Sequence, residues 1–375
     1  MELNILAPLQ DIILEKISTS EASWVSFSEY MNATLYHPSH GYYSRDVNRF
    51  GLNRDFVTAP EIGPELAYVI GAQILPLLRS SKNPVILELG AGSGVLARDI
   101  INYLSSHQEK SFKYEIIEVS KALIKRQKEV LSDSPIAVKW NSDPKDLAKF
   151  DCIVVANEYI DALPVDRFIM KKQQPFALGV SAIGETFKWS QHDPDANLIQ
   201  QYQSIGKSIT DQFTDGYTSE YYNPIYFSDL KRLLEQINGF AFFIDYGLPE
   251  KDYYYSDRIR GTLTCYAGHK VHDNPFINVG FQDVTSWVNF TYFYKMIEQC
   301  GWKLNGFTTQ AEFIINGGID QYVKAQSDSP SLEVMNRIKK LILPGEMGEN
   351  VKVIVFEKSP SMHYILPGKS LRSRL

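Results

Sequence analysis

The residues with the clearest chemical potential lie in one short run, Glu88-Leu-Gly-Ala-Gly-Ser-Gly94. A glycine-rich turn lets the backbone approach a ligand closely, because no Cβ atom intervenes. If a helix follows, its first N–H groups and the positive end of its dipole suit an anionic group. Glu118 follows Glu88 by thirty residues, and a carboxylate there could accept hydrogen bonds from both hydroxyls of a ribose. The run therefore predicts a cofactor site for a nucleoside-containing ligand.

Two classes of cofactor use such a turn. A dinucleotide turn has the form GxGxxG, but counted from Gly90 its third glycine position holds Val95. The compact GxGxG spacing, with an acid two residues before the first glycine, is typical of S-adenosylmethionine sites instead. An ordinary strand-to-helix turn is the structural alternative, and the two acids disfavour it. The expected cofactor-binding residues of this part of the chain are Glu88, Gly90, Ala91, Gly92, Gly94 and Glu118.

A second candidate run is Asn157-Glu-Tyr-Ile-Asp161, directly after an apolar stretch. In open α/β sheets ligands bind at the carboxyl ends of the strands, so this run should face the same crevice. Asn157 could bind the amino-acid end of the cofactor, and Glu158 and Asp161 could hold a cationic or amine acceptor. A turn capped by Asn or Asp is the alternative. The run lacks the Asn/Asp-Pro-Pro-aromatic signature of amino methylation on nucleic-acid bases.

Alternating strands and helices must position these two runs. Short apolar stretches are separated by segments with helical periodicity, a pattern that indicates a parallel, doubly wound α/β sheet with right-handed crossovers. The predicted strands are 85–89, 112–118, 136–140 and 152–156, and the helices between the first three are 94–104 and 120–131.

The remaining segments divide the chain around this core. Helices are expected over 3–35, where Ser26 and Glu29 have capping-box spacing, and a small antiparallel meander is expected after 165. The sheet should resume at 239, with a helix over 284–299 and a frayed C-terminal end. The expected segments are 1–80 (helical cap and active-site loop), 81–164 (first half of the core, with the cofactor site), 165–238 (α+β insertion, a substrate or partner region), 239–358 (second half) and 359–375 (tail).

Composition bounds the class of protein. The 375 residues are 44% hydrophobic and 22% charged, which excludes wholesale disorder, and the net charge of −6 disfavours non-specific nucleic-acid binding. Three widely separated cysteines predict no disulfide framework and fit a reducing compartment, so we expect a cytoplasmic protein. The N-terminal sequence does not have the form of a signal peptide, and the best apolar window, 69–78, is too short to span a membrane.

A metal site is not expected. His269, His272 and Asp273 are close in sequence, but the run has no fourth ligand at helical spacing and no cysteine partner.

Taken together, the motifs resemble the MidA family of S-adenosylmethionine-dependent methyltransferases, which is similar to a mitochondrial arginine methyltransferase that assists respiratory complex I assembly. Besides the glycine turn, the motifs that carry the resemblance are Phe27-Ser-Glu-Tyr-Met31, Leu35-Tyr-His-Pro38, Asp55-Phe-Val-Thr58 with Pro60-Glu61, Asn157-Glu158 with Asp161-Ala-Leu-Pro164, Ile244-Asp-Tyr-Gly247, Gly261-Thr-Leu263, Gln282-Asp-Val-Thr285 and Leu343-Pro-Gly345.

The resemblance implies a class I (Rossmann-like) methyltransferase fold and a protein acceptor, with arginine first and a respiratory complex I subunit as a conceivable client. It adds Thr58 and Pro60 to the expected cofactor site and Glu61 to the catalytic group, which becomes Glu158, Asp161 and Glu61. Two carboxylates could clamp a guanidinium through charged hydrogen bonds, and one could accept its proton. A small-molecule O- or N-methyltransferase and a non-catalytic assembly or binding protein on the same fold are the alternatives. We expect a protein partner, no nucleic acid and no membrane insertion, and leave a homodimer open.

Overall fold

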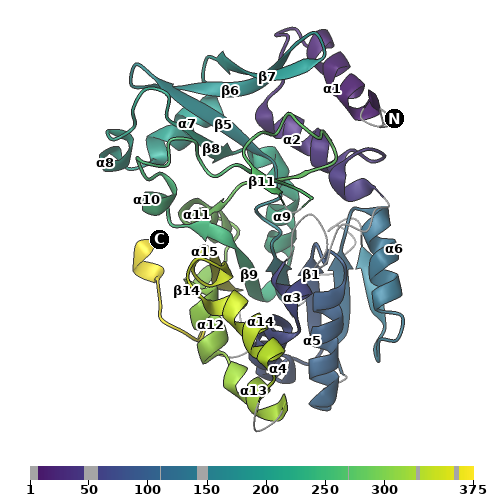
Figure 1. Ribbon diagram of the computed structural model, residues 1–375. Coiled ribbons are helices and arrows are strands. Elements are labelled where there is room, and N and C mark those ends of the chain that lie inside the picture. Colours follow the sequence, from purple (N-terminus) through teal and green to yellow (C-terminus); the bar gives the residue numbers. More distant parts are fainter. Residues whose placement is uncertain are drawn as a thin grey trace. The chain divides into compact units, whose positions relative to one another are not determined.

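The computed structural model describes residues 7–45, 58–109, 111–141, 151–268, 270–326, 330–358 and 363–375. They form two compact units, which we describe separately (Figure 1). One comprises residues 1–48, 161–228 and 249–287, and the other comprises 49–160, 229–248 and 288–375. We call the second the sheet unit and the first the meander unit. This division differs from the expected segments, because the described residues 58–80 belong with the sheet rather than with the N-terminal helices.

The sheet unit contains the predicted α/β core. Its helical elements are α3 (Ala59–Ile62), α4 (Glu65–Ser80), α5 (Val95–Ser106), α6 (Lys121–Val130), α11 (Phe290–Glu298), α12 (Gln310–Asn316), α13 (Ile319–Gln326), α14 (Leu332–Ile342), α15 (Met347–Asn350) and the 3-10 turn η3 (Arg372–Arg374). Its strands are β1 (Val85–Leu89), β2 (Lys113–Ile117), β3 (Val138–Asn141), β4 (Asp151–Asn157), β9 (Asn238–Leu248), β13 (Val288–Asn289), β14 (Lys303–Thr309) and β15 (Val351–Lys358). Helix α9 (Pro224–Gln236) has residues in both units.

The strands of this sheet have the order β14-β15-β9-β4-β1-β2-β3. Strand β1 pairs in parallel with β2 and β4, and β4 pairs in parallel with β9. Strand β15 is antiparallel to both β9 and β14, so the sheet is mixed rather than wholly parallel. The parallel strands β1, β2 and β4 therefore end at one edge, where the two candidate runs begin.

Helices cover both faces of the sheet. Alternate residues of β9, Phe240, Phe242 and Ile244, join a buried cluster with apolar residues of α4 and α5. The intervening Phe243 points the other way and packs edge-on against Phe293 of α11, with ring centroids 4.9 Å apart. This alternation explains why β9 has a continuous apolar sequence rather than a polar–apolar repeat.

The C-terminal segment is ordered against β14, so the expected frayed tail is wrong. Tyr364 and Leu366 are buried, and Leu366 lies where a Cβ atom on Gly306 would stand. The backbone N–H of Leu371 donates to the carbonyl of Phe307 at 2.8 Å. Apolar side chains before the basic end thus hold the segment to the sheet.

The meander unit combines helices with short antiparallel strands. Its helical elements are α1 (Ala7–Thr19), α2 (Phe27–Tyr36), η1 (Tyr42–Ser44), α7 (Ala196–Ser204), α8 (Lys207–Thr210) and α10 (Glu250–Tyr253). Its strands are β5 (Val165–Lys171), β6 (Gln174–Ile183), β7 (Thr186–His192), β8 (Thr218–Tyr222), β10 (Thr264–Ala267), β11 (Lys270–His272) and β12 (Asp283–Thr285).

Several local expectations can be checked here. The meander is confirmed as β7-β6-β5, extended by β8, which the sequence did not predict. The capping box is confirmed, since Ser26 and Glu29 bond each other's backbone at the start of α2. The helix expected over 284–299 is wrong before Phe290, because residues 283–285 pair with β10 and residues 288–289 pair with β9.

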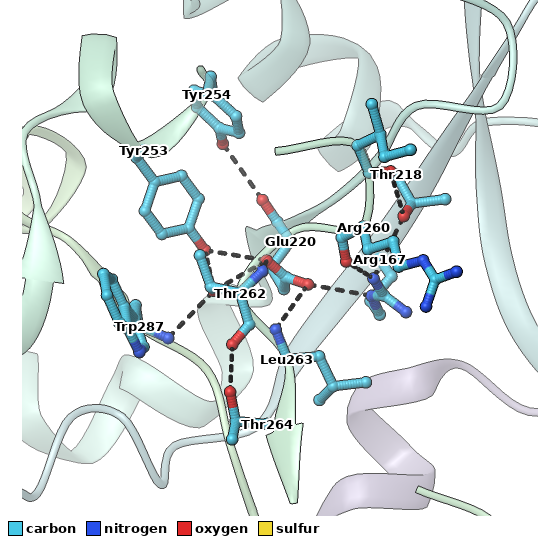
Figure 2. Close-up of polar contacts among 11 residues, drawn as sticks. Arg167, Thr218, Glu220, Tyr253, Tyr254, Arg260, Thr262, Leu263, Thr264 and Trp287 are labelled. Carbon is cyan, nitrogen blue, oxygen red and sulfur yellow. Dashed lines mark hydrogen bonds and ion pairs between the residues drawn. The ribbon is translucent and has the colours of Figure 1, made fainter. Parts of the chain in front are cut away.

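A buried ion pair fastens the meander to a following loop (Figure 2). Arg167 on β5 donates from Nε to the carboxylate of Glu220 on β8 at 3.1 Å, and both side chains are almost fully buried. The same carboxylate accepts from the backbone N–H of Thr262 at 2.8 Å, and Arg167 Nη2 donates to the carbonyl of Arg260 at 2.6 Å. A Cβ atom on Gly261 would stand against Glu220, which explains the glycine in the Gly-Thr-Leu motif.

We expect Glu220→Gln to lower the free energy of unfolding by about 2 kcal/mol, because the buried Arg167 loses its anionic partner. Chemical denaturation at pH 7.5 measures the difference, with the exposed Glu185→Gln as the matched control. Equal free energies of unfolding for the two variants would show that the ion pair makes no net contribution to stability.

Candidate functional site

The glycine turn joins β1 to α5 in the conformation that its composition predicts. Gly90, Gly92 and Gly94 have φ values of 65°, 52° and 88°, in the left-handed region that disfavours side chains. The turn is closed by a hydrogen bond from the N–H of Gly94 to the carbonyl of Ala91 at 2.8 Å, and Gly90 N–H donates to Ile117 of β2 at 3.0 Å. The start of α5 is thereby held at the edge of the sheet.

Two buried carboxyl groups flank this turn. Glu88 on β1 is 1% exposed and accepts a hydrogen bond from the Tyr114 hydroxyl at 2.7 Å. Glu118, directly after β2, accepts from the backbone N–H of Ser120 at 2.9 Å and from Gln127 Nε2 at 3.1 Å. Burial raises the pKa of each glutamate to about 7, and the Glu118 charge contributes to the rise at Glu88. These carboxyls therefore change charge close to neutral pH.

If Glu118 binds the cofactor ribose as the sequence predicts, its pKa gives cofactor binding a pH dependence with a defined sign. Glu118 is mostly protonated at pH 6 and ionised at pH 8, and the ionised form is the better acceptor for ribose hydroxyls. We expect the affinity for S-adenosylhomocysteine to be about tenfold higher at pH 8 than at pH 6. Calorimetric titrations at several pH values measure the profile. Glu118→Gln should flatten it, whereas an unchanged profile in that variant would assign the titration to another group.

The short helix α3 is bonded to the glycine turn. Ser93, inside the turn, donates its hydroxyl to Glu61 of α3. The backbone N–H of Ala59, at the start of α3, donates to Glu158 Oε1 at 3.3 Å. One predicted catalytic glutamate, Glu61, thus lies on α3, and the other, Glu158, bonds the first residue of α3 from a different segment. Residues 46–57, which include the Asp55-Phe-Val part of the family motif, lie outside the described residues.

The segment after β4 has an uncommon backbone, which a further buried acid, Asp245, holds in place. Glu158 has φ +48°, a conformation that non-glycine residues adopt mostly where surrounding structure fixes them. Asp245, on β9, accepts from the backbone N–H groups of Tyr159 at 3.1 Å and Ile160 at 2.8 Å. It also accepts from its neighbour Tyr246. Asp245 therefore fixes the backbone on which Asn157 and Glu158 are carried.

Most predicted site residues lie in the sheet unit. Ala91 contributes its backbone to the turn, while its side chain belongs to the apolar core. Thr58 precedes α3 as its N-cap residue, and Pro60 is buried within α3. Asp161 begins the meander unit, where burial raises the pKa of Tyr43 and the charge of Asp161 is one of several smaller contributions. Its expected role beside Glu158 stays a prediction.

Other residues of the site were not predicted. Gln127 and Ser93 bond predicted residues, and Asp245 bonds the backbone that follows Glu158. Tyr159 lies against Gly90, where an added Cβ atom would stand 2.9 Å from its ring. Asp245 had a usable signal, since it is an acid near the end of an apolar strand. Gln127 had none, because it stands among lysines and arginines on a predicted surface helix.

The residues present fit S-adenosylmethionine. Asn157 Oδ1 is buried and has no hydrogen-bond partner among the described residues, so it can accept from the cofactor's ammonium group. Glu118 can accept from ribose hydroxyls, and its neighbour Val119 is a 64% exposed apolar side chain that suits the face of a purine. The left-handed turn brings backbone close to the ligand. When bound, this cofactor supplies an electrophilic methyl group.

The family of this chain follows from a match that covers more than half of its sequence. The family described as "Putative S-adenosyl-L-methionine-dependent methyltransferase" (Methyltransf_28) matches residues 69–308, which include the glycine turn and the Asn157–Asp161 run. The chain belongs to this family, the MidA-like methyltransferases. Its S-adenosylmethionine dependence and its class I fold, both expected from the sequence, are confirmed.

Known proteins resemble the chain over most of its length. A crystal structure of a COG1565 superfamily member from Burkholderia thailandensis, bound to S-adenosyl-homocysteine, is 31% identical with a TM-score of 0.88 and covers 97% of this chain and 96% of that one. The Bos taurus protein arginine methyltransferase NDUFAF7, mitochondrial, is 25% identical over 96% of this chain and 86% of its own. Its Drosophila melanogaster homologue is 26% identical over 71% of this chain, and the match spans 65% of the homologue's length.

Two further observations concern other kinds of site. Among the described residues, no group of three or more His, Cys, Asp or Glu side chains is placed to hold a metal ion, and His269 lies outside those residues. Within the same ranges no helix combines the length and apolar character needed to cross a bilayer.

Proposed function

We propose that this methyltransferase modifies protein side chains and that arginine is its acceptor. The relatives named as protein arginine methyltransferases support this proposal, although they are about 25% identical to the chain. The observation that carries it is that Glu61 lies on the short helix α3, bonded to the glycine turn through Ser93, while Glu158 bonds the first residue of the same helix. Two carboxylates suit a guanidinium, which presents its donors in a planar fork.

In this proposal Glu158 is the catalytic base. A guanidinium must lose a proton before one of its nitrogens can act as a nucleophile, and a positioned carboxylate can receive it. Glu158 has a left-handed backbone conformation, and Asp245 bonds the backbone of the next two residues. Together these features fix the position of the Glu158 backbone, from which its carboxylate extends. Glu61, held by Ser93, orients the acceptor, and Asp161 is proposed as a further acidic contact.

The client and the compartment belong to the proposal as well. A subunit of respiratory complex I, or a similar assembly client, is the acceptor class that the family resemblance implies. The three separate cysteines are buried and none of them is in a disulfide, which fits a reducing compartment such as the cytoplasm.

Product analysis tests the acceptor directly. The purified enzyme is incubated with cell lysate and S-adenosylmethionine carrying a labelled methyl group, and the labelled protein is hydrolysed to amino acids. We expect the label in methylarginine. Label in another amino acid would change the acceptor type, and label only in small molecules would favour a small-molecule methyltransferase.

A further inference from the structure

Gln127 is a buried amide on an otherwise solvated helix. Helix α6 carries lysine and arginine on its exposed side, and Gln127 is its one buried residue, with 0% exposure. A glutamine buried so completely must satisfy its amide groups within the protein, so its partners are informative.

Those partners are the two halves of the cofactor site. Gln127 Nε2 donates to Glu118 Oε2 at 3.1 Å and to the carbonyl of Gly92, in the glycine turn, at 3.0 Å. On the other side of the amide, the indole Nε1–H of Trp140 donates to Gln127 Oε1 at 2.9 Å. Since an indole N–H can only donate, Trp140 fixes the orientation of the amide and directs its NH2 group toward the two acceptors.

Helix α6 can come close enough for these bonds because Gly94 has no side chain. A Cβ atom added to Gly94 would lie 3.2 Å from the Cα atom of Gln127 and 3.3 Å from its Cγ atom. Glycine suits this position, because a Cβ atom would be crowded by Gln127 and because φ +88° disfavours side chains. The last glycine of the turn therefore serves packing against α6 as well as the turn itself.

We propose that Gln127 is a positioning residue that locks the Glu118 carboxylate and the glycine turn into the arrangement that binds the cofactor ribose. The inference rests on the proposed role of Glu118 as the ribose ligand. One Glu118 oxygen is bonded by Ser120 and the other by Gln127, so the carboxylate has a fixed plane. The backbone N–H of Val119 also bonds this carboxylate, and the group still has acceptor capacity for a ribose hydroxyl, because a carboxylate has about four lone-pair sites.

A simple packing role would not select these partners. An apolar side chain could fill the same space at lower cost, because a buried amide must first lose its water. The NH2 group of Gln127 instead donates one hydrogen bond to Gly92 of the glycine turn and one to the Glu118 carboxylate. Its bond to Glu118 also favours the ionised carboxylate.

Gln127→Met tests the proposal, because methionine keeps the length and removes both the donor and the acceptor. The probes are S-adenosylhomocysteine and its 2′-deoxy analogue, titrated calorimetrically between pH 6 and pH 8.5. The matched control is the exposed neighbour Arg126→Met, and a thermal melt verifies folding of each variant. If Gln127→Met does not fold, Trp140→Phe removes the donor that orients the amide and should shift the same measurements in the same direction.

In the native enzyme S-adenosylhomocysteine should bind at least about tenfold more tightly than the deoxy analogue. Gln127→Met should weaken the binding of S-adenosylhomocysteine by about tenfold, reduce that preference toward one and move the pH midpoint of binding upward. Equal weakening of both ligands with an unchanged midpoint, or no weakening, would overturn the proposal.

Glu118→Gln separates this inference from its premise. If Glu118 is the ribose ligand, the preference for S-adenosylhomocysteine over the deoxy analogue falls in that variant too. If the preference remains as in the native enzyme, the role of Glu118 fails, and the role of Gln127 fails with it. A preference lost in Glu118→Gln but kept in Gln127→Met overturns the Gln127 inference alone.

Discussion

Glu158→Gln should reduce methyl transfer by at least about a hundredfold while leaving the affinity for S-adenosylhomocysteine within about twofold. Glutamine has nearly the same shape, and its carbonyl oxygen can still accept from the N–H of Ala59. It cannot take up the proton that an acceptor guanidinium loses. Methyl transfer is measured with labelled cofactor and a lysate acceptor, and binding is measured by calorimetry.

The exposed Glu129→Gln provides a matched control that removes one carboxylate far less buried than the site acids. Two results would contradict the assignment of Glu158. Turnover close to that of the native enzyme would show that its carboxylate is not the base. A large loss of S-adenosylhomocysteine binding would assign the residue to the cofactor instead.

Asp245→Ala should lower the free energy of unfolding by about 3 kcal/mol or more. The buried carboxylate accepts from three backbone N–H groups, and alanine would leave them without partners in the interior. Because two of those groups belong to Tyr159 and Ile160, the backbone at Glu158 should also lose its fixed position. Chemical denaturation measures the first effect, and the methyl-transfer assay measures the second.

Two further variants serve as controls for this prediction. Asp229→Ala removes an exposed aspartate and should cost little. Asp245→Asn keeps one acceptor oxygen, so it should be less harmful than Asp245→Ala. If Asp245→Ala proved as stable and as active as Asp229→Ala, the proposed support of the Glu158 backbone would be wrong.

The sequence predicted those parts of the fold that depend on neighbouring residues. Strand β1 has the predicted bounds, because a buried apolar run ends abruptly at glycine. The capping box at Ser26 is likewise local. Helix α11, in contrast, begins later than expected, since Asn289 caps it by accepting from the N–H of Tyr292. The residues before Asn289 have apolar side chains that a helix or a strand could bury, and only pairing with other strands decides between them.

The candidate site divides in the same way. The glycine turn and Glu118 were predictable, because spacing along two consecutive strands places them at one edge of the sheet. The contacts of Gln127 and Asp245 depend on tertiary packing between segments far apart in sequence. Nothing in the sequence around Gln127 distinguishes a buried amide from a solvated one, so its role emerges only from its three hydrogen bonds.

We expect the glycine turn and Glu118 to form the S-adenosylmethionine site of this enzyme. Calorimetric titration of the purified protein with S-adenosylhomocysteine at pH 8 tests it most directly, with Gly92→Leu as the comparison, because leucine is strained at φ +52°. We predict saturable one-to-one binding in the native protein and its loss in a folded Gly92→Leu variant. Absence of binding by the folded native protein, or equal binding by both, would contradict the account.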